Sequence, residues 1–121
     1  MARVLFIDDR LGEVIRQWQK SGCASNHELL PLEPFDSIER TCQLAESLKP
    51  TVIIVGYGLG KPDITGADVI LSLRQKGYKG LVVANSGGGV EQFKRANVEV
   101  DGSANRTPRD LKKAMDNLTK E

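Results

Sequence analysis

The sequence has few of the residues on which metal and thiol chemistry depend. Its 121 residues include two cysteines, Cys23 and Cys42, and a single histidine, His27. The cysteines lack the paired spacing of a zinc site, and one histidine cannot complete such a site. We therefore interpret both cysteines as ordinary small side chains in a reducing compartment.

The sequence also lacks an excess of charge of either sign and any long apolar run. It has 17 Lys and Arg against 16 Asp and Glu, a formal net charge of +1. This balance gives no electrostatic reason to expect nucleic acid or an anionic membrane as a partner. No apolar run approaches the roughly 20 residues that span a bilayer, and the N-terminus does not resemble a signal peptide. We expect a cytoplasmic protein.

Segments that predict strands alternate with segments that predict helices along the chain. Strand-like runs occupy residues 3–7, 28–32, 52–55 and 81–84, and residues 102–105 form a weaker candidate. The run Val52–Val55 is β-branched without alternation, which is typical of a central parallel strand covered on both faces. Pro31 indicates that the second run lies at an edge of the sheet. We expect a glycine-rich loop from Gly56 to Gly66.

Helical patterns fill the remaining segments. Asp36 or Ser37 can cap the second helix, Gly22 marks the end of the first, and Thr107-Pro108 begins the last. A short helix is expected at about residues 90–96. The residues predicted to face inward are Leu11, Val14, Ile15 and Trp18, then Ile38, Cys42, Ala45 and Leu48, then Val69, Ile70 and Leu73, and finally Leu111, Ala114, Met115 and Leu118.

About five alternations of strand and helix over one domain length predict an α/β fold. We expect a flavodoxin-like, doubly wound sheet of five parallel strands with helices on both faces. No internal repeat or linker-like composition divides residues 1–121, so we expect a single domain. Functional groups in such folds gather at the carboxyl ends of the strands. Those ends carry Asp8-Asp9, Gly56 to Gly60, Asn85-Ser86 and Asn105-Arg106.

These residues give the chain a resemblance, over essentially its whole length, to the receiver domains of two-component response regulators. Asp8-Asp9 matches the family's metal-binding acidic pair, and the segment 66–70 resembles the start of its third helix. Asn85-Ser86 stands where the family has a Thr or Ser followed by a small residue. Arg106 falls near the family's invariant lysine, and Asn105 is the alternative for that place. The resemblance implies the receiver fold and a role in phosphorelay signal transduction.

The main departure from the family lies at Gly56. In a receiver, the residue that ends the third strand is the aspartate that accepts phosphate. Glycine has no nucleophilic atom, so an aspartyl phosphate cannot form at this position. Asp63, farther out in the loop, is a poor substitute because phosphoryl transfer depends on positioning. The resemblance therefore implies a pseudo-receiver, a degenerate receiver that is not phosphorylated at the usual site.

The acidic pair admits three interpretations. Asp8 and Asp9, with water and a carbonyl near Gly58, would hold Mg²⁺ weakly at most, because this ion prefers six oxygen ligands in near-ideal geometry. The pair could instead cap the first helix and stabilise its dipole. Alternatively, Arg106 could form an ion pair with one of the two carboxylates. We favour the two structural interpretations and expect no cofactor beyond weak magnesium.

Two glycine clusters face the same end of the predicted sheet. Gly87, Gly88 and Gly89 follow Ser86, and successive backbone N–H groups there could form an anion-binding loop. Gly56, Gly58 and Gly60 could line the opposite side. The alternative is that glycine permits tight turns, and we favour it because neither cluster matches a phosphate-binding fingerprint.

Two classes of function remain. The first is a signalling module that binds another signalling protein or domain. The resemblance places its interaction face on the fourth helix, fifth strand and fifth helix, from about Val90 to Leu118, where we expect Phe93, Arg95 and Lys112 to be exposed or partly exposed. Small residues at the switch positions, with no aromatic between Gly102 and Arg106, predict one fixed conformation.

The second class is a small-molecule or anion sensor that binds at the glycine loops. An enzyme is not expected, because the sequence offers no nucleophile–base pair and no complete metal set. We expect no nucleic acid or membrane partner, and a monomer or weak homodimer.

Overall fold

Five parallel strands form the central sheet of the computed structural model, which describes residues 2–86 and 90–119. The strands are β1 (Arg3–Ile7), β2 (Glu28–Leu32), β3 (Val52–Val55), β6 (Leu81–Ala84) and β7 (Gly102–Ser103). Their spatial order is β2-β1-β3-β6-β7, and every neighbouring pair is parallel. The order reverses between β1 and β3, which makes this a doubly wound, flavodoxin-like sheet and confirms the predicted fold class.

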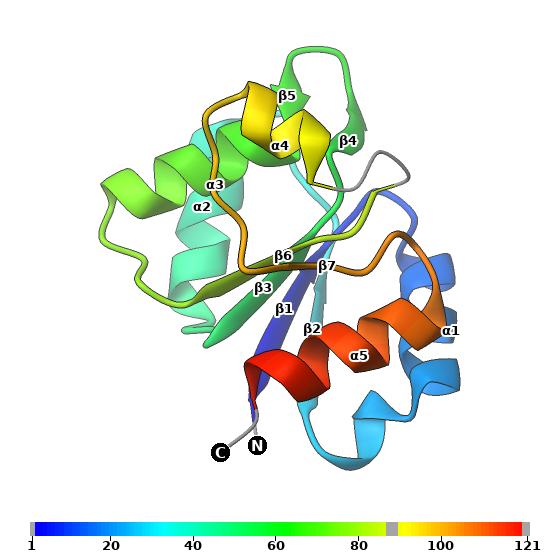
Figure 1. Ribbon diagram of the computed structural model, residues 1–121. Coiled ribbons are helices and arrows are strands. Elements are labelled where there is room, and N and C mark those ends of the chain that lie inside the picture. Colours follow the sequence, from blue (N-terminus) through cyan, green and yellow to red (C-terminus); the bar gives the residue numbers. More distant parts are fainter. Residues whose placement is uncertain (1, 87–89, 120–121) are drawn as a thin grey trace.

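Helices cover both faces of this sheet (Figure 1). The helices α1 (Leu11–Ser21) and α5 (Pro108–Leu118) pack against each other on one face. The helices α2 (Ile38–Ser47), α3 (Gly66–Gln75) and α4 (Glu91–Arg95) cover the other. Alternate residues of β3 serve the two sides: Ile53 and Val55 join the core under α2, α3 and α4, while Val52 and Ile54 join the core under α1 and α5. All four are buried, as expected for a central strand.

The helix ends follow local chemistry that the sequence predicts. Ser37 is the N-cap of α2 and accepts the N–H of Arg40, and Thr107 is the N-cap of α5 with Pro108 in the first turn. Gly22 ends α1 in the left-handed conformation, with φ at +83°. The prediction for Ile15 is wrong: it lies on the outer side of α1 and is 37% exposed, because Val14 and Trp18 occupy the buried face.

The segment after β3 differs from the expected loop. A two-stranded antiparallel hairpin forms there, from β4 (Gly58–Lys61) and β5 (Ile64–Thr65). The side chains of Leu59 in β4 and Ile64 in β5 are buried in the core and anchor the hairpin there. Lys61 reaches Asp36 at 3.1 Å, so the hairpin is also joined to the loop before α2.

The prediction that Phe93 is exposed is wrong. Its side chain is fully buried in the core on the α2–α3–α4 side of the sheet. Its ring meets the ring of Tyr57 edge-on, with centroids 5.6 Å apart. The two cysteines are buried and not in disulfides, and Cys23 begins the short 3₁₀ helix η1 (Cys23–Ser25). None of the helices in the described ranges combines the length and apolar character needed to cross a bilayer.

Candidate functional site at the carboxyl edge of the sheet

The carboxyl ends of the three central strands bring Asp8, Gly56 and Asn85 into one row. Each follows the last residue of its strand, and backbone bonds continue the sheet ladder beyond those ends. The N–H of Gly56 donates to the carbonyl of Ile7 at 3.2 Å, and that of Asn85 donates to the carbonyl of Val55 at 2.9 Å. The parallel register therefore holds the three predicted positions side by side.

Asp8 is the most constrained acid of this edge. Its side chain is almost completely buried, and Oδ1 accepts the N–H of Arg10 at 3.0 Å. The other oxygen, Oδ2, is buried and accepts no hydrogen bond from the residues that the structure describes. Burial raises the pKa of Asp8, while the Arg10 N–H and the positive charge of Arg106 lower it in part. The site thus contains a carboxyl group whose charged form is poorly stabilised.

Gly56 leaves the space beside this oxygen without a side chain. An added Cβ at Gly56 would lie 3.0 Å from Oδ2 of Asp8 and 3.6 Å from the carbonyl oxygens of Gly58 and Asn85. A side chain here would therefore enter a narrow space lined by oxygen atoms. The site has no nucleophilic atom at the end of β3, where the family places its phosphate acceptor.

The hairpin approaches the second acid of the pair. Gly60 adopts the left-handed conformation with φ at +71°, and an added Cβ would lie 2.7 Å from Oδ2 of Asp9. Only glycine permits both this backbone conformation and this close approach. Asp63, the suggested substitute acceptor, lies exposed in the turn of the same hairpin.

The helix-capping interpretation of the acidic pair is wrong. The N-cap of α1 is Arg10, and no side chain makes a capping hydrogen bond there. Asp8 accepts the N–H of Arg10 itself, outside the helix, because its side chain is held under the strand end. The expected ion pair with Arg106 is also missing among the described residues, where the four ion pairs involve other groups. Arg106 acts on Asp8 only through its charge at longer range.

The structure separates the roles of Asn105 and Arg106. Asn105 turns toward the start of α5: its Oδ1 accepts the hydroxyl of Ser103 at 2.8 Å, and its Nδ2 donates to Asp110 at 3.4 Å. Arg106 donates its backbone N–H to Oδ1 of Asn85 at 2.9 Å, so Asn85 joins the ends of β6 and β7. Both Asn105 and Arg106 have positive φ, 48° and 60°, which turns the chain back toward the site.

Sequence reasoning missed Gln17 and the contact between Tyr57 and Phe93. The side-chain amide of Gln17 donates to the carbonyl of Arg106 at 2.9 Å and thereby fixes the β7–α5 turn against α1. Tyr57 packs against Phe93 and so connects the end of β3 with α4. The sequence signal for Tyr57 was its place directly after Gly56. No local pattern marks Gln17, whose partner is distant in the chain.

The second glycine cluster can be described only at its beginning. Ser86 is buried at the end of β6, next to Asn85. Gly87, Gly88 and Gly89, the suggested anion-binding loop, lie outside the described residues. Gly58 and Gly60 belong to strand β4 rather than to a loop, and Gly60 faces a carboxylate.

The oxygen groups at this edge do not complete the magnesium site that the resemblance implies. They comprise two carboxylates and the carbonyl oxygens near Gly56, and burial already disfavours the ionised form of Asp8. The described residues contain no group of three His, Cys, Asp or Glu side chains that could hold a metal ion. Mg²⁺ demands near-octahedral oxygen ligands, which these groups alone do not supply.

Comparison with known proteins identifies the fold. No family model matches the sequence, and a search of curated proteins finds no match. Chemotaxis protein CheY4 of Vibrio cholerae superposes with a TM-score of 0.75 at 17% identity, over 98% of both chains. A LuxR-family DNA-binding response regulator from Staphylococcus aureus gives 0.73 at 20% identity, also over 98% of both. The signal receiver domain of a modulated diguanylate cyclase from Desulfovibrio desulfuricans G20 gives 0.70 at 19% identity, over 98% of this chain and 93% of that one. The chain has the fold of a receiver domain.

Proposed function

We propose that this protein is a receiver-type signalling domain of the two-component kind that is not phosphorylated at the usual strand end. The fold supports the signalling role, since receivers with this architecture occur in the response regulators to which it is similar. The observation that carries the rest is Gly56, which has no acceptor atom and leaves little space beside Oδ2 of Asp8. The domain is not an enzyme under this proposal and acts by binding another signalling protein.

The interaction face of this proposal combines α4, β7 and α5. Arg95 and Lys112 are exposed on these elements, and Val90 is 39% exposed beside the start of α4. Phe93 is excluded as a contact because it is fully buried. Val90 lies beside Lys94 and Glu99, and an exposed apolar residue with charged neighbours suits a protein partner, since apolar anchors with a polar rim are the usual arrangement of an interface.

Small buried residues support a single conformation of this face. Ala104 is fully buried, and its N–H donates to the carbonyl of Ala84 at 2.8 Å. Asn85 is buried, and its Oδ1 accepts a hydrogen bond from the backbone N–H of Arg106. A side chain as small as that of Ala104 has no second rotamer of different burial, so the aromatic element that switches receivers has no counterpart here.

The test is exposure to a phosphodonor. We expect acetyl phosphate, or beryllofluoride with Mg²⁺, to leave the intact mass and the NMR spectrum of residues 90–115 unchanged. A receiver that retains the acceptor aspartate, treated in parallel, is the positive control. A mass increase of one phosphoryl group that is lost in mild base would contradict the proposal and direct attention to Asp63. Widespread donor-dependent shifts in residues 90–115 would refute the single conformation.

The alternative of an anion sensor receives no support from the described residues. The carboxylates of Asp8 and Asp9 lie against Gly56 and Gly60, and they would repel an anion held between them. We therefore do not propose a ligand for this edge of the sheet.

A further inference from the structure

A groove lined by charged side chains lies away from the strand ends, between α1 and α5. It has a volume of about 620 Å³ and is lined by Lys20 and Ser21 at the end of α1 and by residues of α5 from Pro108 to Asn117. This groove lies on the side of α5 that faces α1. The groove shares Lys112 with the interaction face proposed above, which is otherwise built from β7 and α4.

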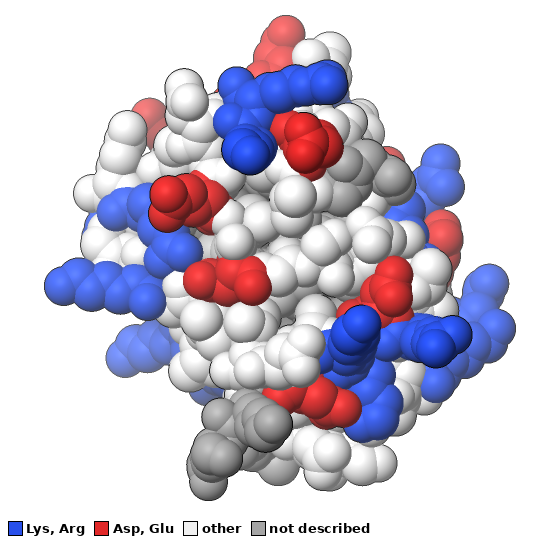
Figure 2. Space-filling model, in the orientation of Figure 1, with Lys and Arg blue, Asp and Glu red and all other residues white. Residues whose placement is uncertain are grey.

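Positive charge is concentrated around this groove. Four cations line it, Lys20, Arg109, Lys112 and Lys113, against the single carboxylate of Asp116. Figure 2 shows Lys and Arg side chains gathered at the lower right of the view, where α5 and α1 lie in Figure 1. The whole chain carries a net charge of only +1, so the surface outside the groove carries an excess of acid.

Three of these cations have no carboxylate partner among residues 2–86 and 90–119. Lys112 forms an ion pair with Asp116 at 3.0 Å, one turn along α5. Lys20, Arg109 and Lys113 form no ion pair with any residue in the described ranges. Arg109 lies in the first turn of α5, where the helix dipole already places positive potential and a cation is unfavourable by about 0.3–1 kcal/mol. An anionic group in the groove would relieve this repulsion.

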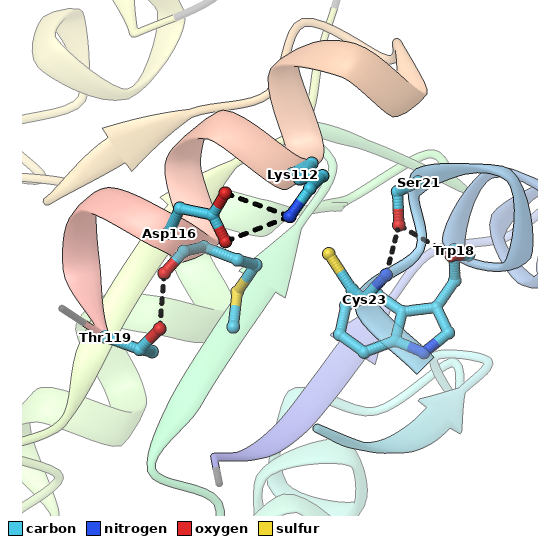
Figure 3. A network of polar contacts seen from close by, with 7 residues as sticks. Trp18, Ser21, Cys23, Lys112, Asp116 and Thr119 are labelled. Carbon is cyan, nitrogen blue, oxygen red and sulfur yellow. Dashed lines mark hydrogen bonds and ion pairs between the residues drawn. The ribbon is translucent and has the colours of Figure 1, made fainter. Parts of the chain in front are cut away.

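The α1 side of the groove is held in place by hydrogen bonds of Ser21. The hydroxyl of Ser21 donates to the carbonyl of Trp18 at 2.6 Å and accepts the N–H of Cys23 at 3.1 Å. Figure 3 shows this end of α1 facing Lys112 and Asp116 on α5. The charges of Lys112 and Asp116 influence the pKa of the buried Cys23 thiol, which burial raises. A binding surface that is already ordered loses little conformational entropy when a partner docks.

We propose that this groove binds an acidic segment of a partner protein. A short peptide with carboxylates can match the local cluster and remain within it. A long polyanion, such as nucleic acid or an anionic membrane, extends beyond the groove and meets the surrounding acidic surface. The interaction range of exposed charges is about 8–10 Å in ordinary salt, so the groove attracts a ligand of its own size. This inference does not depend on whether the domain is phosphorylated.

The experiment is an NMR titration of the full chain with a short peptide of Glu, Leu and Ala, and with a matched peptide in which Gln replaces every Glu. We expect saturable shifts confined to residues 20, 21 and 108–117 with the acidic peptide only. The double variant Lys20→Glu/Lys113→Glu should bind at least about tenfold more weakly, because each reversal turns an exposed attraction into a repulsion. The matched control Lys76→Glu/Lys79→Glu makes the same change in net charge at exposed positions outside the groove and should bind within about twofold of wild type.

Three results would overturn the inference. The first is no saturable shift up to millimolar peptide, and the second is an equal loss of binding in the control variant. The third is tighter binding of a DNA oligonucleotide or of phosphatidylserine vesicles than of the acidic peptide, which would assign the groove to a different class of partner. Circular dichroism of each variant establishes that it is folded. The phosphodonor test is unaffected by these outcomes, so each proposal fails separately.

Discussion

Replacing Asp8 by asparagine tests the electrostatics of the strand-end site. Asn keeps the size of Asp and can keep the hydrogen bond from the Arg10 N–H to Oδ1. It removes the charge from Oδ2, which is buried without a hydrogen bond among the described residues. The new Nδ2 group would enter the region of the Gly58 and Asn85 carbonyl oxygens, each 3.6 Å from the position of an added Cβ on Gly56. We therefore expect Asp8→Asn to stabilise the protein at neutral pH.

The size of the effect follows from the cost of a buried unsatisfied polar group. That cost is about 1–3 kcal/mol, and more for a charged group. For a chain of this length, about 1 kcal/mol corresponds to about 4 °C in Tm, so we expect an increase of about 4–12 °C at pH 7. Thermal unfolding followed by circular dichroism in the presence of a chelator measures it. The control is Asp63→Asn, the same chemical change at an exposed turn, which should shift Tm by less than about 2 °C.

The stability difference between Asp8→Asn and wild type should also depend on pH. Burial raises the pKa of Asp8 in the folded protein, so the folded state binds this proton more tightly than the unfolded chain does. The stability linked to this proton is fully present below the unfolded pKa of about 3.9 and is lost as the pH rises through the higher folded pKa. The advantage of Asp8→Asn over wild type should therefore be small near pH 4 and grow above it. A lower Tm for the variant at pH 7, or a difference that is constant from pH 4 to 8, would refute the reasoning.

Three further predictions concern Gly60, Phe93 and magnesium binding. Gly60→Ala should destabilise the protein by at least about 1–2 kcal/mol in a denaturant titration, because its φ is +71° and the added Cβ would lie 2.7 Å from the Asp9 carboxylate. The control is Gly12→Ala in α1, where an added Cβ has nothing within 4 Å, and it should stabilise the protein by about 0.5–1 kcal/mol. Phe93→Ala should cost about 3–5 kcal/mol of unfolding free energy, since the ring is fully buried; a loss below 1 kcal/mol would contradict its place in the core. Mg²⁺ at a few millimolar should raise the stability by no more than about 0.4 kcal/mol, as expected for a Kd no tighter than that concentration, and a larger shift that Asp9→Asn abolishes would show a genuine metal site.

The fold could be predicted from the sequence because its main signals are local and strong. The β-branched run Val52–Val55 is buried on both faces, and a fully buried strand has this composition whatever its neighbours are. Pro31 lies in β2, which the structure places at an edge of the sheet. Thr107 and Pro108 begin α5 by hydrogen bonding and fixed φ, which also require no tertiary contact. The candidate positions Asp8, Gly56 and Asn85 then follow from parallel register alone.

The missed features depend on contacts between distant segments. The helix α4 has five residues, too few for a helical period to reveal which face is buried, so the burial of Phe93 became visible only with its contact to Tyr57. The hairpin was hidden because two of the four residues of β4 are glycine and β5 has only two residues. The turn residues Pro62-Asp63 between Leu59 and Ile64 were the available signal for it. The helix cap assigned to the acidic pair failed because Asp8 is fixed beneath the strand end before α1 begins.

The surroundings of Gly56 bear on the proposal that the domain is not phosphorylated at the end of β3. An added Cβ at this position would lie 3.0 Å from Oδ2 of Asp8, so that side chain would have to shift slightly, and the hairpin approaches Asp9 through Gly60. Tyr57, the next residue, packs edge-on against the ring of Phe93 in α4. A new aspartate at position 56 would add a third negative charge beside the two carboxylates, and Arg106, whose charge lowers the pKa of Asp8, forms no ion pair with either among the described residues. These surroundings support our proposal that the domain acts through its surfaces rather than through a phosphorylated strand end.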